Sequence, residues 1–395
     1  MREFSSDPRV CNRCGYCQSE CPVYRETGLE RTVARGRLDI LRASHSMDLE
    51  MNTDPVLYDC TLCGSCREGC PLGVDVPGII MRERERAADG GRAPFLIPGL
   101  MDGLLTRPRL MEYASAALRV YDAAGIRRVF RTLGLMGGQE GLLPAKIPPS
   151  FRSRRRAPRR ETPVAYFLGC ATNLFYPQVA EAVLAISNRM ASAIEPAQNL
   201  CCGLPALVYG NRKLALELAR RNVEILEGVE RIVTDCATCA SSLKAYGRWL
   251  EDDPDWAARA RAVARRVRGI SEYLLEADAP PGEMASTASI HYPCHLTRHQ
   301  ECGESLDEAL RQVKGLEIRP MEGAGDCCGG AGTYVVTHPR LAEGIGSRKC
   351  DSVRQTGAEV LVTECPACMS QLGRLMPRGS RVLHVAQVFA GAAGG

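Results

Sequence analysis

The sequence predicts an α+β multidomain protein in which a helical N-terminal domain precedes two duplicated α/β modules. One cysteine spacing occurs twice near the N-terminus, and a different cysteine pattern occurs twice in the remainder. In that remainder, short apolar runs alternate with helix-like segments, which is typical of βαβ units around a parallel sheet. We therefore divide the chain into a helical domain (1–93), a helical and basic linker region (94–161), a first module (162–280) and a second module (281–395).

The N-terminal domain carries two cysteine runs of identical spacing. The first is Cys11-x2-Cys14-x2-Cys17-x3-Cys21-Pro, and the second repeats it from Cys60 to Cys70-Pro. This is the bacterial [4Fe-4S] run, in which three close thiolates hold one cluster and the fourth ligates the other. The spacing predicts two cubane clusters, one held by Cys11, Cys14, Cys17 and Cys70, the other by Cys60, Cys63, Cys66 and Cys21.

Structural zinc is the competing interpretation of these runs, because C-x2-C pairs also bind zinc. A zinc ribbon needs two such pairs and no further cysteine followed by proline, so the complete runs favour iron. Gly15 and Gly64 lie inside the runs, where the lack of a Cβ allows the backbone to fold closely around an inorganic core.

The second cysteine pattern combines a single cysteine, a Cys-Cys-Gly turn and a C-x2-C pair. Cys170 recurs as Cys294, 124 residues later, and the other corresponding cysteines are 126 and 129 residues apart. The C-terminal part of the chain is thus an internal duplication. Its candidate ligands are Cys170, Cys201, Cys202, Cys236 and Cys239 in the first copy and Cys294, Cys327, Cys328, Cys365 and Cys368 in the second.

Four apolar, β-branched runs stop just before these cysteines, at residues 164–168, 231–234, near 290 and 360–363, and are predicted to be buried strands. Helices are predicted over 177–190, 214–226, 305–313 and 340–355. Because ligands gather at the carboxyl ends of parallel strands, each module should present its thiols at one edge. Five thiolates exceed the needs of a simple cube, so we expect one or two further [4Fe-4S] clusters, cubane or noncubane.

The motif order resembles that of the CCG-domain iron-sulfur oxidoreductases over nearly the whole chain. The family includes heterodisulfide reductase and the iron-sulfur subunits of glycolate oxidase, lactate oxidase and anaerobic glycerol-3-phosphate dehydrogenase. The likeness to the glycolate oxidase subunit is carried by Cys21-Pro-Val-Tyr24, Arg35-Gly-Arg37, Cys327-Cys-Gly-Gly-Ala-Gly-Thr-Tyr334 and Thr337-His-Pro339.

The resemblance implies an electron-transfer subunit that works with a FAD-containing 2-hydroxyacid (glycolate or lactate) dehydrogenase and passes electrons to quinone or an electron-transferring flavoprotein. One feature departs from the likeness to the glycolate oxidase subunit. Both modules keep all five cysteine ligands, and in this they resemble the catalytic subunit of heterodisulfide reductase. The alternative is therefore disulfide cleavage at noncubane clusters. A scaffold without metal is the third interpretation, and the intact ligands argue against it.

Three histidines surround Cys294, and the resemblance places this segment at the cavity of the second module. His295 and His299 are candidate catalytic proton donors, because imidazole titrates near neutral pH; the alternative is a supporting role beside the ligands. Arg35 and Arg37 are either surface charges or donors near a cluster. Cys302 and Cys350 match no motif and are expected to be small buried hydrophobes.

Composition predicts a cytoplasmic protein with at most peripheral contact at the inner face of the membrane. The chain has no long apolar run or signal-like N-terminus, and a net charge of +4 gives no indication of nucleic-acid binding. The basic run at 152–160 is either a solvated linker or a contact for anionic lipid. The apolar residues of 94–143 are expected to pack on the N-terminal domain, the alternatives being a partner protein or a membrane.

No flavin-binding fingerprint is visible, so substrate oxidation should occur on another polypeptide.

Overall fold

The computed structural model describes residues 4–47, 55–91, 103–125, 147–154, 163–190, 193–377 and 379–391. The N-terminal domain is helical, and its longest helices among the described residues are α3 and α6. Its elements are η1 (Pro8–Val10), α1 (Tyr16–Glu20), α2 (Pro22–Thr27), η2 (Glu30–Thr32), α3 (Ala34–Ser46), α4 (Pro55–Tyr58), α5 (Ser65–Glu68) and α6 (Val76–Asp89).

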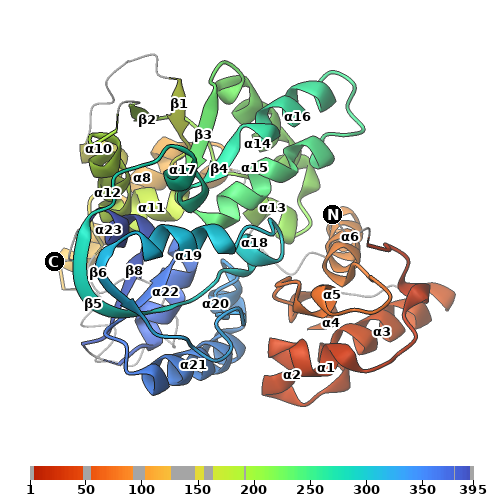
Figure 1. Ribbon diagram of the computed structural model, residues 1–395. Coiled ribbons are helices and arrows are strands. Elements are labelled where there is room, and N and C mark those ends of the chain that lie inside the picture. The colour runs from red at the N-terminus through yellow and green to blue at the C-terminus, as the bar shows by residue number, and fades with distance from the viewer. Residues whose placement is uncertain are drawn as a thin grey trace.

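The first module is a four-stranded parallel sheet with the order β2-β1-β3-β4, surrounded by helices (Figure 1). The strands are β1 (Val164–Tyr166), β2 (Ile194–Pro196), β3 (Arg231–Thr234) and β4 (Val267–Gly269). The helices are α11 (Cys170–Phe175), α12 (Pro177–Ser187), α13 (Leu204–Val208), α14 (Arg212–Leu226), α15 (Ala237–Trp249), α16 (Ala257–Arg265) and α17 (Ile270–Glu276).

The second module repeats this topology, with the parallel order β6-β5-β7-β8. The strands are β5 (Glu283–Ile290), β6 (Lys314–Ile318), β7 (Val360–Thr363) and β8 (Arg381–His384). The helices are α18 (Cys294–Thr297), α19 (Glu304–Arg311), α20 (Tyr334–Thr337), α21 (Pro339–Thr356), α22 (Pro366–Leu375) and α23 (Val385–Phe389).

The register of the two sheets confirms the duplication at residue level. Val164 of β1 pairs with Arg231 of β3, and Ala288 of β5 pairs with Val360 of β7. These pairs are 124 and 129 residues apart in the two copies, as are the cysteines that follow the strands. Each predicted strand is one of the two central strands of its sheet. The edge strands β2, β4, β6 and β8 were not predicted from the sequence.

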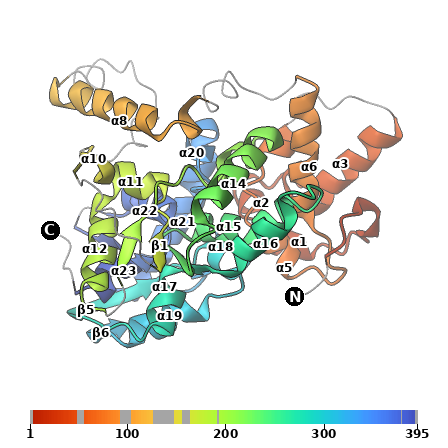
Figure 2. The same cartoon turned by 90° about the horizontal axis from the view of Figure 1, so that it is seen from above.

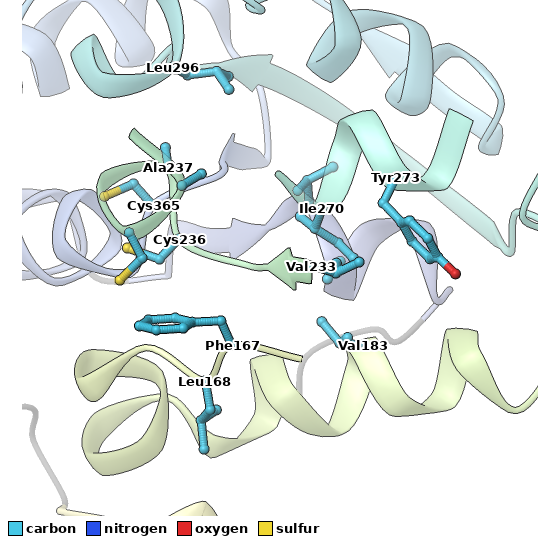
Figure 3. Close-up of a cluster of buried hydrophobic side chains, with 14 of the residues drawn as sticks. Phe167, Leu168, Val183, Val233, Cys236, Ala237, Ile270, Tyr273, Leu296 and Cys365 are labelled. Carbon is cyan, nitrogen blue, oxygen red and sulfur yellow. The ribbon is translucent and has the colours of Figure 1, made fainter. Parts of the chain in front are cut away.

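The two modules share one continuous hydrophobic core. In the first module, Val183 of α12, Val233 of β3 and Ile270 of α17 are fully buried (Figure 3). Leu296 of the second module belongs to the same cluster. Because the modules bury apolar surface against each other, the edges that carry their cysteines are held in a fixed relative position.

The N-terminal domain lies beside the two modules rather than within their core (Figure 1). Ion pairs join it to the second module: Arg25 with Asp326 at 2.9 Å and Arg298 with Glu68 at 2.7 Å. Arg84 of α6 is buried and joins it to the first module by donating to the Val208 carbonyl at 2.8 Å. The domain therefore contacts both modules.

Only parts of the predicted linker region are described, namely 103–125 and 147–154. They contain α8 (Pro108–Ala123) and α10 (Phe151–Arg154). Leu105 and Phe151 join the core shared by the modules, so this segment packs on the first module and not, as expected, on the N-terminal domain. Figure 2 shows α8 near α10, on the side of the molecule away from α1 and α3.

The start of the basic run also differs from a solvated linker. Arg152 is largely withdrawn from solvent and donates to the carbonyls of Ala197 and Asn199, each at 3.1 Å. The rest of that run, and the apolar pairs at 96–97 and 133–136, lie outside the described residues. Within the described residues, no helix is long and apolar enough to cross a membrane.

Candidate iron-sulfur sites

The structure brings together the two predicted cysteine sets of the N-terminal domain. A small cavity of about 30 Å³ is lined by Cys11, Cys14, Cys17 and Cys70, and also by Cys66, which the spacing had assigned to the other cluster. The thiols of Cys21, Cys60, Cys63 and Cys66 lie close enough together to influence one another's ionisation. The exchange of the fourth cysteine between the two runs is therefore compatible with the fold.

Both runs have the same unusual backbone conformation. Arg13 and Leu62, at equivalent places, have φ values of 63° and 56°, and each is followed two residues later by a left-handed glycine, Gly15 or Gly64. Non-glycine residues seldom adopt positive φ, and such residues concentrate at functional sites. Because the same unfavourable backbone conformation occurs in both cysteine runs, we infer that each loop is folded around a bound group.

Main-chain N–H groups point at the cysteine sulfurs, as an anionic iron-thiolate group requires. In the N-terminal domain the donors are Tyr24 to Cys21 (3.5 Å), Leu62 to Cys60 (3.4 Å) and Val74 to Cys70 (3.5 Å). In the second module Gly329 donates to Cys327 and Gly330 to Cys328, both at 3.4 Å. The residues present thus fit iron-sulfur clusters.

Burial, opposed by a hydrogen bond from Tyr24, raises the pKa of the Cys21 thiol to about 12. Burial likewise raises the pKa of Cys66 well above its usual range, assisted by the neighbouring thiols. Thiols at these positions keep their protons at neutral pH. Cluster assembly must displace those protons, because the metal ligand is the thiolate.

In each module the five cysteines meet at the carboxyl edge of the sheet. Cys170 and Cys294 open the helices after β1 and β5, and Cys236 and Cys365 directly precede α15 and α22. In the second module the Cys328 and Cys368 sulfurs are 3.2 Å apart. In the first, Cys202 lies within hydrogen-bonding reach of Cys201 and Cys239. The predicted convergence of thiols is present in both copies.

The Cys-Cys-Gly turns need glycine for two physical reasons. Gly203 and Gly329 have φ values of 85° and 76°, a region that glycine enters without a steric penalty. A Cβ at Gly203 would also come within 3.1 Å of the Ala215 carbonyl, and at Gly329 within 2.7 Å of the Ala342 carbonyl. Each turn is therefore pressed against the second helix that follows it, α14 or α21.

Both five-cysteine sets open onto one cavity of about 470 Å³ between the N-terminal domain and the modules. Cys202 and Cys239 line it from the first module, and Cys328 and Cys368 from the second. Its other polar lining includes the Asp59–His338 pair, joined at 3.3 Å, with Tyr334 stacked on the His338 ring. This shared cavity is not evident from the sequence.

Direct contacts connect the cysteine sets in series. Cys63 of the N-terminal domain lies within hydrogen-bonding reach of Cys327 in the second module, a contact that lowers the pKa of Cys63 to about 5. Cys365 of the second module lies similarly close to Cys236 of the first, and Figure 3 shows these two side by side. The cysteine set of the second module therefore contacts both the N-terminal set and that of the first module.

The two histidines predicted from the sequence occupy different places. His295 lines the cavity, with Nδ1 3.6 Å from the Cys294 sulfur. His299 stacks on His295 at 4.8 Å and lies 3.3 Å from the Leu62 carbonyl oxygen, outside the cavity lining. Burial lowers the pKa of both rings, which favours neutral imidazoles at this position. His291, in the same segment, lies against Cys328 and Cys368.

The two arginines of the Arg-Gly-Arg sequence have separate functions. Arg37 is buried and donates to the Thr32 carbonyl at 2.7 and 3.0 Å, so it stabilises the domain's interior. Arg35 pairs with Glu30 at 2.5 Å and places positive charge near Cys17. Arg84, which spans the carbonyls of Leu57, Cys60 and Val208, was not singled out from the sequence because its neighbours in the chain form no motif.

The two cysteines outside the motifs are placed as expected. Cys350 is fully buried in the shared core, and Cys302 packs half-buried against it. Burial raises the pKa of Cys350 to about 11 and that of Cys302 to about 12. Both therefore behave as small apolar side chains.

A helical domain with two four-cysteine sets, joined to two α/β modules with five-cysteine sets, defines a multi-cluster iron-sulfur protein. Comparisons with known proteins agree. The 4Fe-4S dicluster domain matches residues 8–74, and the cysteine-rich (CCG) domain matches residues 164–244 and 288–373. The chain is 32% identical to "Lactate utilization protein A" of Bacillus cytotoxicus, over 57% of this chain and 98% of that one. The chain belongs to the CCG-domain iron-sulfur oxidoreductase family.

Two further relatives match over most of this chain. It is 27% identical to "Probable glycolate oxidase iron-sulfur subunit" of Bacillus subtilis (strain 168), covering 97% of this chain and 94% of that one. It is also 27% identical to a subunit of the CoM/CoB fumarate reductase of Methanothermobacter marburgensis, covering 91% and 66%. Among solved structures, a hypothetical protein from Helicobacter pylori shares the fold, with a TM-score of 0.52, 11% identity and coverage of 92% and 66%.

Proposed function

We propose that this chain is the iron-sulfur electron-transfer subunit of a FAD-dependent 2-hydroxyacid dehydrogenase complex, with glycolate or lactate as the substrate. The names of the relatives with 27% and 32% identity support this substrate class. Substrate oxidation would occur on a partner flavoprotein. Quinone or an electron-transferring flavoprotein would accept the electrons. We place the complex in the cytoplasm, with at most peripheral contact at the inner face of the membrane.

The ligand sets that we propose are supported by the proximity of the cysteines in the fold. Cys11, Cys14, Cys17 and Cys70 would hold one cubane cluster, and Cys60, Cys63, Cys66 and Cys21 the other. The five cysteines of each module would hold a further [4Fe-4S] cluster. When bound, such clusters supply one-electron transfer at potentials that the protein sets through hydrogen bonds and burial.

The observation that carries the proposal is the spatial series of cysteine sets. Cys14 is exposed to solvent, Cys63 adjoins Cys327, and Cys365 adjoins Cys236. Each set is thus next to another, from the surface to the shared cavity. A chain built to relay electrons requires this continuity, and a metal-free scaffold would not.

Disulfide cleavage is the second candidate function, and one observation favours it. Both five-cysteine sets face a single cavity, so a small molecule there could contact both. The similarity to the CoM/CoB fumarate reductase agrees with a function at a sulfur-containing substrate. His295 lines this cavity and is the better placed of the two candidate proton donors, with His299 behind it.

The first experiment counts iron in anaerobically purified protein. Four [4Fe-4S] sites predict about 16 irons per chain. About eight irons with an empty CCG half, or stoichiometric zinc, would contradict the proposal. The second experiment adds a heterodisulfide to the reduced protein. The relay function predicts that none is consumed, whereas stoichiometric consumption that is slowed in His295→Ala or His299→Ala would make disulfide cleavage the function.

A further inference from the structure

His291 is a buried histidine that lies against a thiol. Its side chain is 1% exposed, and among the described residues neither ring nitrogen has a nitrogen or oxygen partner, although the Cys328 thiol lies close enough to interact with the ring. Burying both polar atoms of an imidazole with no partner other than a weakly hydrogen-bonding thiol is unfavourable. The position therefore leaves a ring nitrogen free for a further ligand.

The surroundings of the ring indicate what this is. A His291 ring nitrogen and the sulfurs of Cys328 and Cys368 all lie within 4.8 Å of one another. The backbone N–H of His291 donates to the Val362 carbonyl at 2.9 Å, so the residue continues β5 beside β7 and leaves the sheet at its carboxyl edge. This edge is where the cysteine ligands of the second module gather.

An imidazole ring at this place has the chemistry of a metal ligand, because a ring nitrogen that carries no proton has a lone pair for a metal ion. Lys349, which lies near the ring, is directed elsewhere by its bond to the Ala324 carbonyl at 2.9 Å.

We propose that His291 supplies a nitrogen ligand to iron in the second CCG site, beside Cys328 and Cys368. The inference rests on the proposed function, because it requires an iron-sulfur cluster in that module. It makes the donor set of the second site mixed nitrogen and sulfur.

The first module offers the matched comparison. Strand register aligns His291 with Phe167, since Ala288 and Val164 occupy equivalent positions and each residue lies three places further on. Phe167 is 1% exposed, and Figure 3 shows its ring beside Cys236. A phenyl ring has no donor atom, so the first site has only sulfur. The duplicated modules therefore bind chemically different centres.

A difference in reduction potential follows if His291 ligates iron in place of one of the five thiolates of the second module. A neutral ligand stabilises the oxidised iron less than an anionic one does, so such a replacement raises the potential of an iron-sulfur centre. We therefore expect the second site to have the higher potential of the two CCG sites.

The test compares wild-type protein grown with natural and with ¹⁵N-labelled histidine, using pulsed electron paramagnetic resonance on the partly reduced protein. We expect a strongly coupled nitrogen that changes with the label, disappears in His291→Phe and persists in His45→Gln, whose ring lies at the surface beside Glu83. His291→Cys should keep the full iron content and lose the nitrogen coupling. Its second-site potential should fall, and Phe167→His should leave that potential unchanged.

Two failures are distinguishable. Full iron content in wild type with no strongly coupled nitrogen overturns the ligand assignment and leaves the relay function intact. A CCG half without iron overturns the proposed function itself. The labelling experiment on wild-type protein needs no substitution, so the absence of a coupled nitrogen there refutes the assignment even if His291→Phe does not fold. A coupled nitrogen that is lost in His291→Cys belongs to His291 and not to His295, whose Nδ1 lies 3.6 Å from the Cys294 sulfur.

Discussion

The Gly329→Ala substitution tests whether the Cys-Cys-Gly turn is set by both backbone conformation and close packing. At φ 76° an alanine enters the left-handed region, which costs about 1–2 kcal/mol. Its Cβ would also lie 2.7 Å from the Ala342 carbonyl oxygen, so the backbone must move. Overpacking of this kind typically costs about 1–3 kcal/mol, and we expect a total destabilisation of about 2–5 kcal/mol.

Two other glycines separate the contributions. Gly203→Ala, with φ 85° and a softer 3.1 Å approach to Ala215, should cost about 1–2 kcal/mol. Gly28 has a φ of 64°, and nothing lies within 4 Å of a Cβ added there. Gly28→Ala therefore has only the conformational cost, which is partly offset because alanine also restricts the unfolded chain, and it should destabilise the protein by about 1 kcal/mol or less. The expected order of destabilisation, from least to greatest, is Gly28→Ala, Gly203→Ala, Gly329→Ala.

Amide hydrogen exchange measures these differences module by module, which a global unfolding curve of a multidomain chain does not. In metal-free, reduced protein, exchange from α21 should accelerate in Gly329→Ala, and exchange from α14 should accelerate in Gly203→Ala. The iron-loaded Gly329→Ala protein should lose iron from the second module only. If Gly329→Ala exchanges no faster than Gly28→Ala, close packing does not define the turn and the reasoning is refuted.

Three further substitutions test the relay, the domain contact and a buried histidine. Cys14→Ser should remove one cubane cluster and block transfer to an artificial acceptor, while substrate still reduces the partner's flavin; abolished flavin reduction in an assembled complex would reverse the order of carriers. Arg84→Met leaves the carbonyls of Leu57, Cys60 and Val208 without a donor and should cost about 3 kcal/mol or more, at about 1–3 kcal/mol for each group. It should accelerate hydrogen exchange in both α6 and α13, and unchanged exchange in α13 would show that the residue does not join the domains. Burial lowers the pKa of His384 to about 4. Between pH 4 and 6.5 the unfolded chain therefore carries a proton on this ring that the folded protein does not. The free energy of unfolding should rise with pH across that window by up to about 3 kcal/mol. His384→Gln should flatten this rise in urea unfolding of the metal-free protein at pH 5 and 7, and an unchanged slope would contradict the assignment.

The strands that were predicted and those that were missed differ in burial. Residues Ile232 and Val233 of β3 and the whole of β7 are buried, and such central strands of parallel sheets appear in sequence as continuous apolar runs. At the sheet edges, β6 has no buried residue and β2 has one. Their sequences, Ile-Glu-Pro and Lys-Gly-Leu-Glu-Ile, contain no continuous apolar run, and pairing with β1 and β5 makes them strands.

The histidine segment shows the same limit at the site. The sequence indicated that histidines cluster around Cys294, and it offered no means of deciding which ring faces the thiols. The β5–β7 pairing places His291 against Cys328 and Cys368, whereas His299 stacks behind His295 outside the cavity. The place of each ring is determined by the tertiary structure, because His291 continues β5 whereas His295 lies on α18 and His299 stacks on His295.

The sequence by itself determined the number of cysteine sets, their spacing, the duplication and the family, because ligand spacing is a local property of the chain. Only the tertiary structure decided how the sets are related. Cys63 meets Cys327, Cys236 meets Cys365, and both modules open onto one cavity. These contacts join residues more than 100 positions apart, and they form because the modules bury a common apolar core and Arg84 and Arg298 hold the N-terminal domain against it.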